Sequence, residues 1–67
     1  MNIILNNRNE EIEADQMTVN ELLKYKNFTF KLLVTRINGE LVKKDARDRA
    51  VIREGDDVTV LHLISGG

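Results

Sequence analysis

The residues best placed for chemistry are the last two of the chain, Gly66 and Gly67, because Gly67 carries the terminal carboxylate. At a background glycine frequency of about 7%, two glycines in these places would arise by chance in roughly 0.5% of chains. Glycine has no Cβ, so a Gly-Gly tail can pass through a slit too narrow for any side chain. We expect a flexible tail that delivers the Gly67 carboxylate into another protein's active site; a frayed terminus is the alternative.

Such a carboxylate needs outside help, because it is a poor acylating group until a better leaving group is attached. Adenylation with ATP is the usual way to supply that group. The chain has no Gly-rich phosphate loop followed by Lys, no G-x-G-x-x-G motif and no Cys. The lone His62, flanked by leucines on a strand, is expected at the edge of the core and not as a general base. No cluster of Cys or carboxylate ligands stands at metal spacing around it. The sequence therefore predicts that the protein is not itself an enzyme and binds no cofactor or metal. ATP would be used by a partner enzyme.

Size and composition limit the classes of function that the protein can have. The 67 residues predict a single domain over 1–67, and a chain this short buries only about 60% of its unfolded surface. Ten Lys and Arg against 11 Asp and Glu give a net charge of −1, and the few aromatic residues lie in one short segment, so nucleic acid is disfavoured as a partner. No leader peptide or membrane-length apolar run appears, which predicts a cytoplasmic protein without a membrane partner.

The chain opens with a period-two pattern in which Met1, Ile3 and Leu5 share one face, as expected of a strand. Residues 6–9 are predicted as a hairpin turn. Residues 10–14 are then predicted to return as an edge strand, whose glutamates would discourage pairing with another molecule.

A helix is predicted from residue 18 onward. Thr18 and Glu21 fit a capping box, and Met17 stands at the position of a hydrophobic staple. Apolar residues then recur at helical spacing, and the helix is predicted to end by Asn27, because Asn tolerates the left-handed conformation.

Three further strands follow. Residues 31–37 and 40–42 flank Asn38-Gly39, a strong hairpin signal. Residues 45–52 predict a short helical turn or an irregular crossing loop with Val51 and Ile52 inward, residues 53–57 a polar turn, and residues 58–64 the closing strand. This order of elements predicts an α+β domain, in which a mixed sheet packs on one main helix.

One helix covers only one side of a sheet, so alternation along the closing strand predicts which side chains are exposed. With Val58 and Val60 under the helix, Leu61 and Leu63 face solvent just before the tail. An exposed apolar patch on a small domain marks an interaction site, although single exposed leucines are ordinary. The predicted docking face consists of Leu61, Leu63, Thr59, Leu32, Val34 and Arg36.

The basic residues that follow the strand predicted at residues 40–42 are not assigned to the docking face. They alternate with acidic residues, which predicts a solvated surface that neutralises itself, with at most a minor part in steering an acidic partner. This group comprises Lys43, Lys44, Arg47, Arg49 and Arg53, mixed with Asp45, Asp48 and Glu54.

Several motifs now occur together along the whole chain: the apolar first strand, Thr18-Val19 and Leu22-Leu23, Ile37-Asn38-Gly39-Glu40-Leu41-Val42, Glu54-Gly55-Asp56-Asp57-Val58 and Ile64-Ser65-Gly66-Gly67. They resemble the ThiS sulfur carriers of thiamine biosynthesis. The resemblance implies a ubiquitin-like β-grasp fold. It also implies that an adenylating enzyme related to ubiquitin-activating enzymes acts on Gly67, that a sulfur donor protein converts it to a thiocarboxylate, and that thiazole synthase receives the sulfur.

By the same resemblance, Gly66 lets the tail thread and the apolar patch docks the partners. The family often has Pro-Arg and an aromatic residue after the short fourth strand, where this chain has 43-KKDA-46. The terminal motif is shared with molybdopterin-synthase small subunits. A carrier for molybdopterin or another sulfur metabolite, a non-covalent β-grasp interaction module, and a modifier joined to lysines therefore stay open as alternatives.

Overall fold

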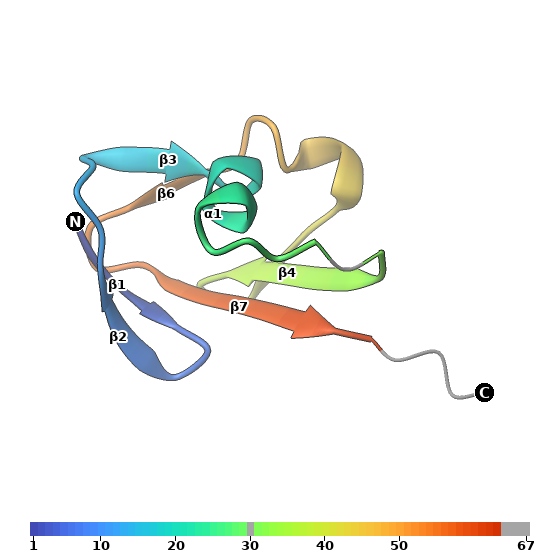
Figure 1. The fold of residues 1–67 in the computed structure, drawn as a ribbon, viewed down its shortest axis with the longest axis horizontal. Helices are drawn as coiled ribbons and strands as arrows, with labels where there is room; N and C mark the ends of the chain where they lie inside the picture. The colour runs from blue at the N-terminus through green and yellow to red at the C-terminus, as the bar shows by residue number, and fades with distance from the viewer. Residues whose placement is uncertain (30, 64–67) are drawn as a thin grey trace.

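Five strands form one mixed sheet in the computed structural model, which describes residues 1–29 and 31–63. The order in space is β2-β1-β7-β4-β5, in which β1 and β7 run parallel and the other neighbours antiparallel. A helix, α1 (Val19–Tyr25), lies across one face of this sheet (Figure 1), which confirms the predicted α+β class. The strands are β1 (Asn2–Leu5), β2 (Arg8–Glu11), β4 (Leu33–Ile37), β5 (Glu40–Val42) and β7 (Asp57–His62).

The first hairpin is tighter than the sequence predicted. Only Asn6 and Asn7 form the turn, with φ angles of 51° and 67°, and β2 begins directly at Arg8. Two left-handed residues make a turn whose twist matches that of the flanking strands, and Asn adopts this conformation readily. β2 lies at the edge of the sheet as expected but ends at Glu11, and the next residue, Ile12, is only 2% exposed.

The helix begins and ends where local chemistry predicted. The Glu21 N–H donates to the Thr18 hydroxyl at 3.1 Å, and the Thr18 N–H donates to the Glu21 carboxylate at 2.8 Å. These two bonds complete the predicted capping box. At the other end Asn27 has a φ of 58°, and the Phe28 N–H donates to the Leu23 carbonyl at 2.8 Å. This bond satisfies a helix carbonyl and turns the chain back toward the sheet.

A second, two-stranded sheet was not predicted. β3 (Gln16–Thr18) pairs antiparallel with β6 (Val51–Arg53), which places Met17 opposite Ile52. Three residues are too few to show a period-two pattern, so the pairing is invisible in the sequence. Ile52 is fully buried as predicted, Val51 is half-buried, and a short 3₁₀ helix, η1 (Lys44–Ala46), supplies the predicted helical turn.

The core lies between α1 and one face of the sheet, and it also includes the small sheet. The buried apolar side chains are Ile3, Leu5, Ile12, Val19, Leu22, Leu23, Val42, Ile52, Val58 and Val60.

Within the described residues, no helix has the length and apolar character that crossing a bilayer demands.

Candidate functional site

The strand that leads to the candidate tail is the central one of the main sheet. β7 is paired with β1 on one side and with β4 on the other, and Val58 and Val60 anchor it with exposures of 0% and 7%. The last described backbone bond runs from the Leu63 N–H to the Leu32 carbonyl at 2.9 Å. The predicted tail residues Gly66 and Gly67 lie outside the described residues. The site therefore consists of this anchored strand and the faces on either side of it.

The register of β4 and β7 gathers the predicted docking residues on the sheet face opposite α1. Val34 stands opposite Leu61, and Arg36 stands opposite Thr59. Val58 and Val60 are buried and Leu61 is exposed, as predicted for β7, and Thr35, between the outward pair on β4, is 1% exposed. We call this set the outer patch: Leu32, Val34, Arg36, Thr59, Leu61 and Leu63.

The outer patch is open to solvent at its apolar members nearest the tail. Leu32, Leu61 and Leu63 are 50%, 44% and 49% exposed, while Val34 and Thr59 are half-buried. Sequence reasoning missed Leu41, which is 58% exposed on β5 and stands opposite Arg36. The alternation rule, extended to residues 40–42, would have found it. The exposed apolar surface thus reaches from the end of β7 toward β5.

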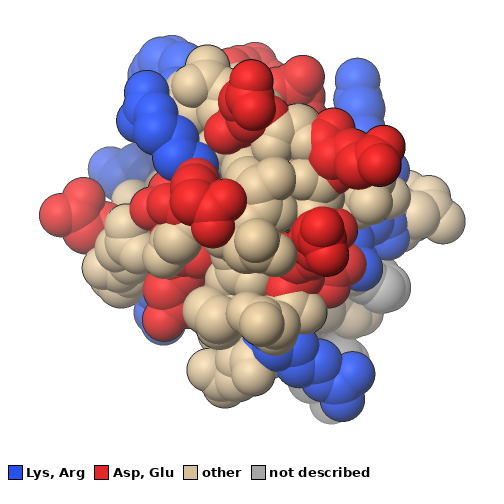
Figure 2. All heavy atoms as spheres, turned by 90° about the vertical axis from the view of Figure 1, so that its left-hand side faces the viewer, with Lys and Arg blue, Asp and Glu red and all other residues tan. Residues whose placement is uncertain are grey.

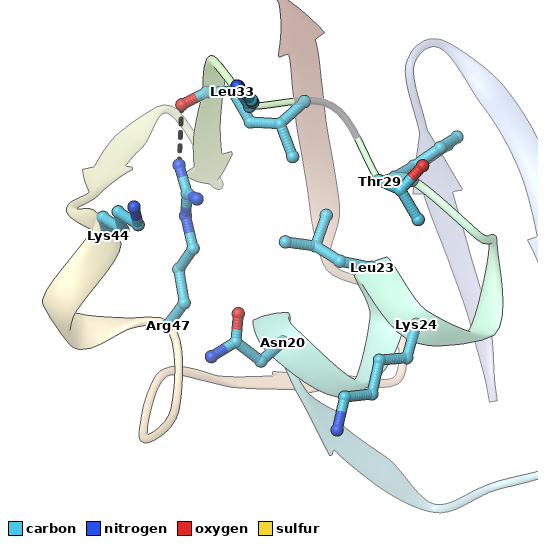
Figure 3. Close-up of a pocket in the computed structure, with 9 residues that line it drawn as sticks. Asn20, Leu23, Lys24, Thr29, Leu33, Lys44 and Arg47 are labelled. Atoms are coloured by element: carbon cyan, nitrogen blue, oxygen red, sulfur yellow. Dashed lines mark hydrogen bonds between the residues drawn. The ribbon is translucent and has the colours of Figure 1, made fainter.

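The assignment of Arg47 to a solvated surface was wrong. Arg47 is only 8% exposed. Its Nε donates to the Thr35 hydroxyl at 3.2 Å. Its Nη2 donates to the Leu33 carbonyl at 2.6 Å, the bond drawn as a dashed line in Figure 3. Thr35 in turn donates to the Val42 carbonyl at 2.8 Å. A guanidinium carries five N–H donors, so it can satisfy several acceptors at once and tie the segment after η1 to the sheet.

His62 was expected at the edge of the core, but its side chain is exposed. The reason is geometric, because α1 has seven residues and β7 has six. A helix of that length extends about 10 Å and a strand of that length about 20 Å, so the helix cannot cover the whole strand. Within residues 1–29 and 31–63, no group of three or more His, Cys, Asp or Glu side chains could hold a metal ion.

Comparisons with known proteins agree with this geometry. The chain matches the model of the ThiS family over residues 3–67. It is similar to the crystal structure of the thiamine biosynthesis protein ThiS from Geobacter metallireducens, with a TM-score of 0.89, 28% identity and 100% of each chain covered. It is also similar to an NMR solution structure of a thiamine biosynthesis protein from the same organism, with a TM-score of 0.82, 28% identity, and 100% of this chain and 88% of that chain covered. A comparison with curated proteins found no match. The structural similarity confirms the ubiquitin-like β-grasp fold.

Proposed function

The chain belongs to the ThiS family of thiamine-biosynthesis sulfur carriers, and we propose that it carries its sulfur on the carboxylate of Gly67. The observation that carries this proposal is the family match, which extends through residue 67 and so includes the Gly-Gly end. The central position of β7 supports it, because a strand paired on both sides is a rigid base from which a tail can be presented.

The proposed chemistry takes place entirely in partner enzymes. An oxygen of the Gly67 carboxylate attacks the α-phosphorus of ATP and expels pyrophosphate, which leaves an acyl adenylate. Hydrosulfide ion supplied by a sulfur donor protein then attacks the carbonyl carbon and expels AMP. Loss of the sulfur-bound proton leaves a thiocarboxylate, in which sulfur has replaced one terminal oxygen. The resulting thiocarboxylate is a nucleophile held on a protein handle, and thiazole synthase is its proposed acceptor.

In this scheme the chain is a substrate and not a catalyst. Gly66 would let the tail pass through a narrow channel, because glycine has no side chain to obstruct it. The outer patch would hold the carrier on each enzyme while the tail is inserted. Apolar side chains that are already exposed, such as Leu61 and Leu63, suit repeated binding and release, since no refolding is needed to present them.

The proposal is tested by incubating the protein with ATP, a cognate adenylating enzyme and a sulfur donor, followed by measurement of its intact mass. We expect a mass increase equal to the difference between sulfur and oxygen. A thiocarboxylated product that then supports thiazole formation with thiazole synthase places the carrier in thiamine biosynthesis. Products linked to lysines of other proteins would instead indicate a modifier, and an unchanged mass, when an authentic carrier reacts, would indicate a non-covalent module.

Deletion of Gly67 provides a sharper test of which atoms react. We expect the shortened protein to accept no sulfur, because the remaining carboxylate on Gly66 stands one residue too far from the catalyst. Its thermal unfolding midpoint should remain close to that of the full chain, since the last residue of a tail contributes little packing. Normal sulfur loading of the shortened protein would rule out Gly67 as the required acceptor.

A further inference from the structure

A second surface lies on the opposite side of β4 and β7 from the outer patch. A cavity of about 330 Å³ opens between α1, the start of β4 and the segment around η1. We call it the basic pocket. Figure 3 shows Asn20 and Leu23 coming from α1, Leu33 from β4, and Lys44 and Arg47 from the η1 side. The basic pocket is lined by Asn20, Leu23, Lys24, Phe28, Thr29, Lys31, Leu33, Lys44 and Arg47.

The charged side chains that line this pocket are all cationic. Lys24, Lys31 and Lys44 are exposed around it, and Arg47 is 8% exposed in its wall. No carboxylate belongs to the lining, and none of the four cations forms an ion pair within residues 1–29 and 31–63. Asp48 lies just outside this lining, where it accepts from the side-chain amide of Asn20. The lining itself therefore contributes positive charge and no negative charge.

The burial of Arg47 makes this excess of charge significant. Removing a guanidinium from water is costly unless an anion or several acceptors compensate it. The hydrogen-bond partners of the Arg47 guanidinium are neutral, namely the Thr35 hydroxyl and the Leu33 carbonyl. These bonds fix the guanidinium in position without cancelling its charge. An anion in the pocket would add the opposite charge to these neutral acceptors, in surroundings less polar than bulk water.

The rest of the lining indicates which anion fits. Leu23, Phe28 and Leu33 give the pocket an apolar component beneath the exposed lysines. An inorganic phosphate would gain nothing from this apolar surface. An Asp or Glu side chain presents a carboxylate on an apolar stem, so that its methylene groups can contact the leucines while the carboxylate meets the cations.

The position of the pocket indicates where such a side chain would come from. Leu33 lines the pocket and stands opposite His62 at the end of β7, so the pocket lies at the end of the sheet where β7 ends. A protein that takes hold of the tail must come close to this pocket.

The remote end of the molecule carries more acidic than basic groups. Figure 2 shows Asp and Glu side chains across this face, around β1, β2, β3 and β6, with Lys and Arg at its margins. The exposed side chains of this region include Glu11, Glu13, Asp15 and Glu54, against Arg8 and Arg53. An acidic partner would therefore be attracted at the tail end and repelled at the other.

We propose that the basic pocket binds an acidic side chain of the adenylating enzyme that acts on the chain end. This inference rests on the proposed function for the identity of that partner. The partner would then contact both sides of the β4–β7 pair, with apolar groups on the outer patch and a carboxylate in the pocket. The carboxylate sets the orientation in which the tail is presented, because it can be satisfied at only one end of the carrier.

A binding experiment tests the pocket without any enzyme. The ¹⁵N-labelled full chain is titrated at low salt with a capped tetraglutamate peptide, a capped tetraglutamine peptide and inorganic phosphate. We expect saturable shifts of the amide signals of Leu23, Thr29 and Lys31 with tetraglutamate, none with tetraglutamine, and weaker binding of phosphate. Phosphate binding as tightly as tetraglutamate, or shifts outside the pocket only, would overturn the assignment to an acidic side chain.

Charge reversal at neighbouring lysines provides the matched control. Lys44 lines the pocket, whereas Lys43 is exposed and does not line it. Lys44→Glu is expected to weaken tetraglutamate binding at least about fivefold, the ratio that corresponds to about 1 kcal/mol. Lys43→Glu should weaken it by less than about twofold, because the charge is screened outside the pocket. Lys31→Glu, from another segment of the lining, should reproduce the effect of Lys44→Glu. Equal losses for Lys43→Glu and Lys44→Glu would refute a localised site.

The same variants are then compared as substrates of the adenylating enzyme. We expect Lys44→Glu to raise the KM for the carrier about fivefold with little change in kcat, and high salt to reduce the difference from the wild type. An unchanged KM together with normal tetraglutamate binding by the wild type would show that this enzyme does not use the pocket. If the wild-type protein accepts no sulfur at all, the proposed function fails, while the peptide titration still decides whether the pocket binds a carboxylate.

Discussion

At the scale of single residues, Asn6 extends the pairing of β1 with β7 beyond the end of β1. Its backbone N–H donates to the Val58 carbonyl at 2.9 Å, and its side-chain oxygen accepts from the Val60 N–H at 2.8 Å. β1 and β7 otherwise pair at only two positions, Ile4 with Asp57 and Leu5 with Val58. One side chain thus helps to hold the central strand on which the tail depends, while the same residue adopts the left-handed conformation of the turn.

Replacing Asn6 by Gly should separate these two roles. Gly tolerates the positive φ of the turn but offers no acceptor for the Val60 N–H. We expect Asn6→Gly to lower the free energy of unfolding by about 1 kcal/mol, the usual contribution of one hydrogen bond. Asn7→Gly, at the neighbouring residue with positive φ, should change it by less than about 0.5 kcal/mol. Urea unfolding measures both variants, and equal losses would show that the turn conformation matters and the Oδ1 bond does not.

Arg47 is the second residue whose contribution can be measured. Arg47→Ala removes the donors to Thr35 and Leu33, and we expect a loss of about 2 kcal/mol in the free energy of unfolding, as is typical of bonds to a charged group. Arg47→Met should recover part of that loss, because it keeps the aliphatic stem and removes a buried charge. Arg49→Ala, at an exposed residue of the same segment, should cost less than about 0.5 kcal/mol. A comparable loss in that control would contradict a specific role for Arg47.

At the scale of elements, α1 is short, and the capping interactions at its ends help to stabilise it. A seven-residue helix is too short to be stable by itself in water, so capping and packing on the sheet must stabilise it. Thr18 has two roles, since it ends β3 and caps α1. The small sheet formed by β3 and β6 therefore fixes the point at which the helix starts.

Removing the cap should measure this dependence. We expect Thr18→Ala to lower the free energy of unfolding by about 1 kcal/mol, because the Glu21 N–H loses its acceptor. Thr29→Ala, at an exposed residue, serves as the matched control and should be nearly neutral. Thermal or urea unfolding followed by circular dichroism reports both. An unchanged stability in Thr18→Ala would show that packing on the sheet suffices to define the helix.

At the scale of the whole molecule, the outer patch and the basic pocket lie on opposite faces of the sheet, and both lie near the end of β7. The outer patch is largely apolar, while the basic pocket on the helix side is cationic. The proposed carrier function requires both surfaces to remain outside the core, so that partners can bind and leave without unfolding the domain. The core is confined to the space between α1, the small sheet and the inner face of the main sheet.

Leu61 tests the docking role of the outer patch. Leu61→Asp should raise the KM for the adenylating enzyme about tenfold, as expected for a contact of moderate importance at an interface. Its unfolding midpoint should change little, because Leu61 is already 44% exposed. Tyr25→Asp is the control, since Tyr25 is 57% exposed but belongs to α1, on the other side of the sheet. The docking role would be refuted by an equal rise of KM for Tyr25→Asp, or by unimpaired activation of Leu61→Asp.

The sequence by itself determined those features that depend on a few neighbouring residues. The capping box at Thr18, the left-handed Asn27 and the Asn38-Gly39 turn were predicted correctly, because each depends on interactions within about four residues. The inward and outward faces of β4 and β7 also followed, since strand alternation is a local rule. The family match agrees with the resemblance that the motifs carried.

Only the tertiary structure decided the features in which distant segments meet. The β3–β6 pairing joins residues more than thirty positions apart. The segment after η1 is bonded to the start of α1, and from there the buried Arg47 side chain reaches the start of β4. A charge run looks the same in the sequence whether it is solvated or enclosed, since burial depends on what packs against it. The basic pocket likewise exists only because helix, strand and loop converge, and no local pattern encodes that convergence.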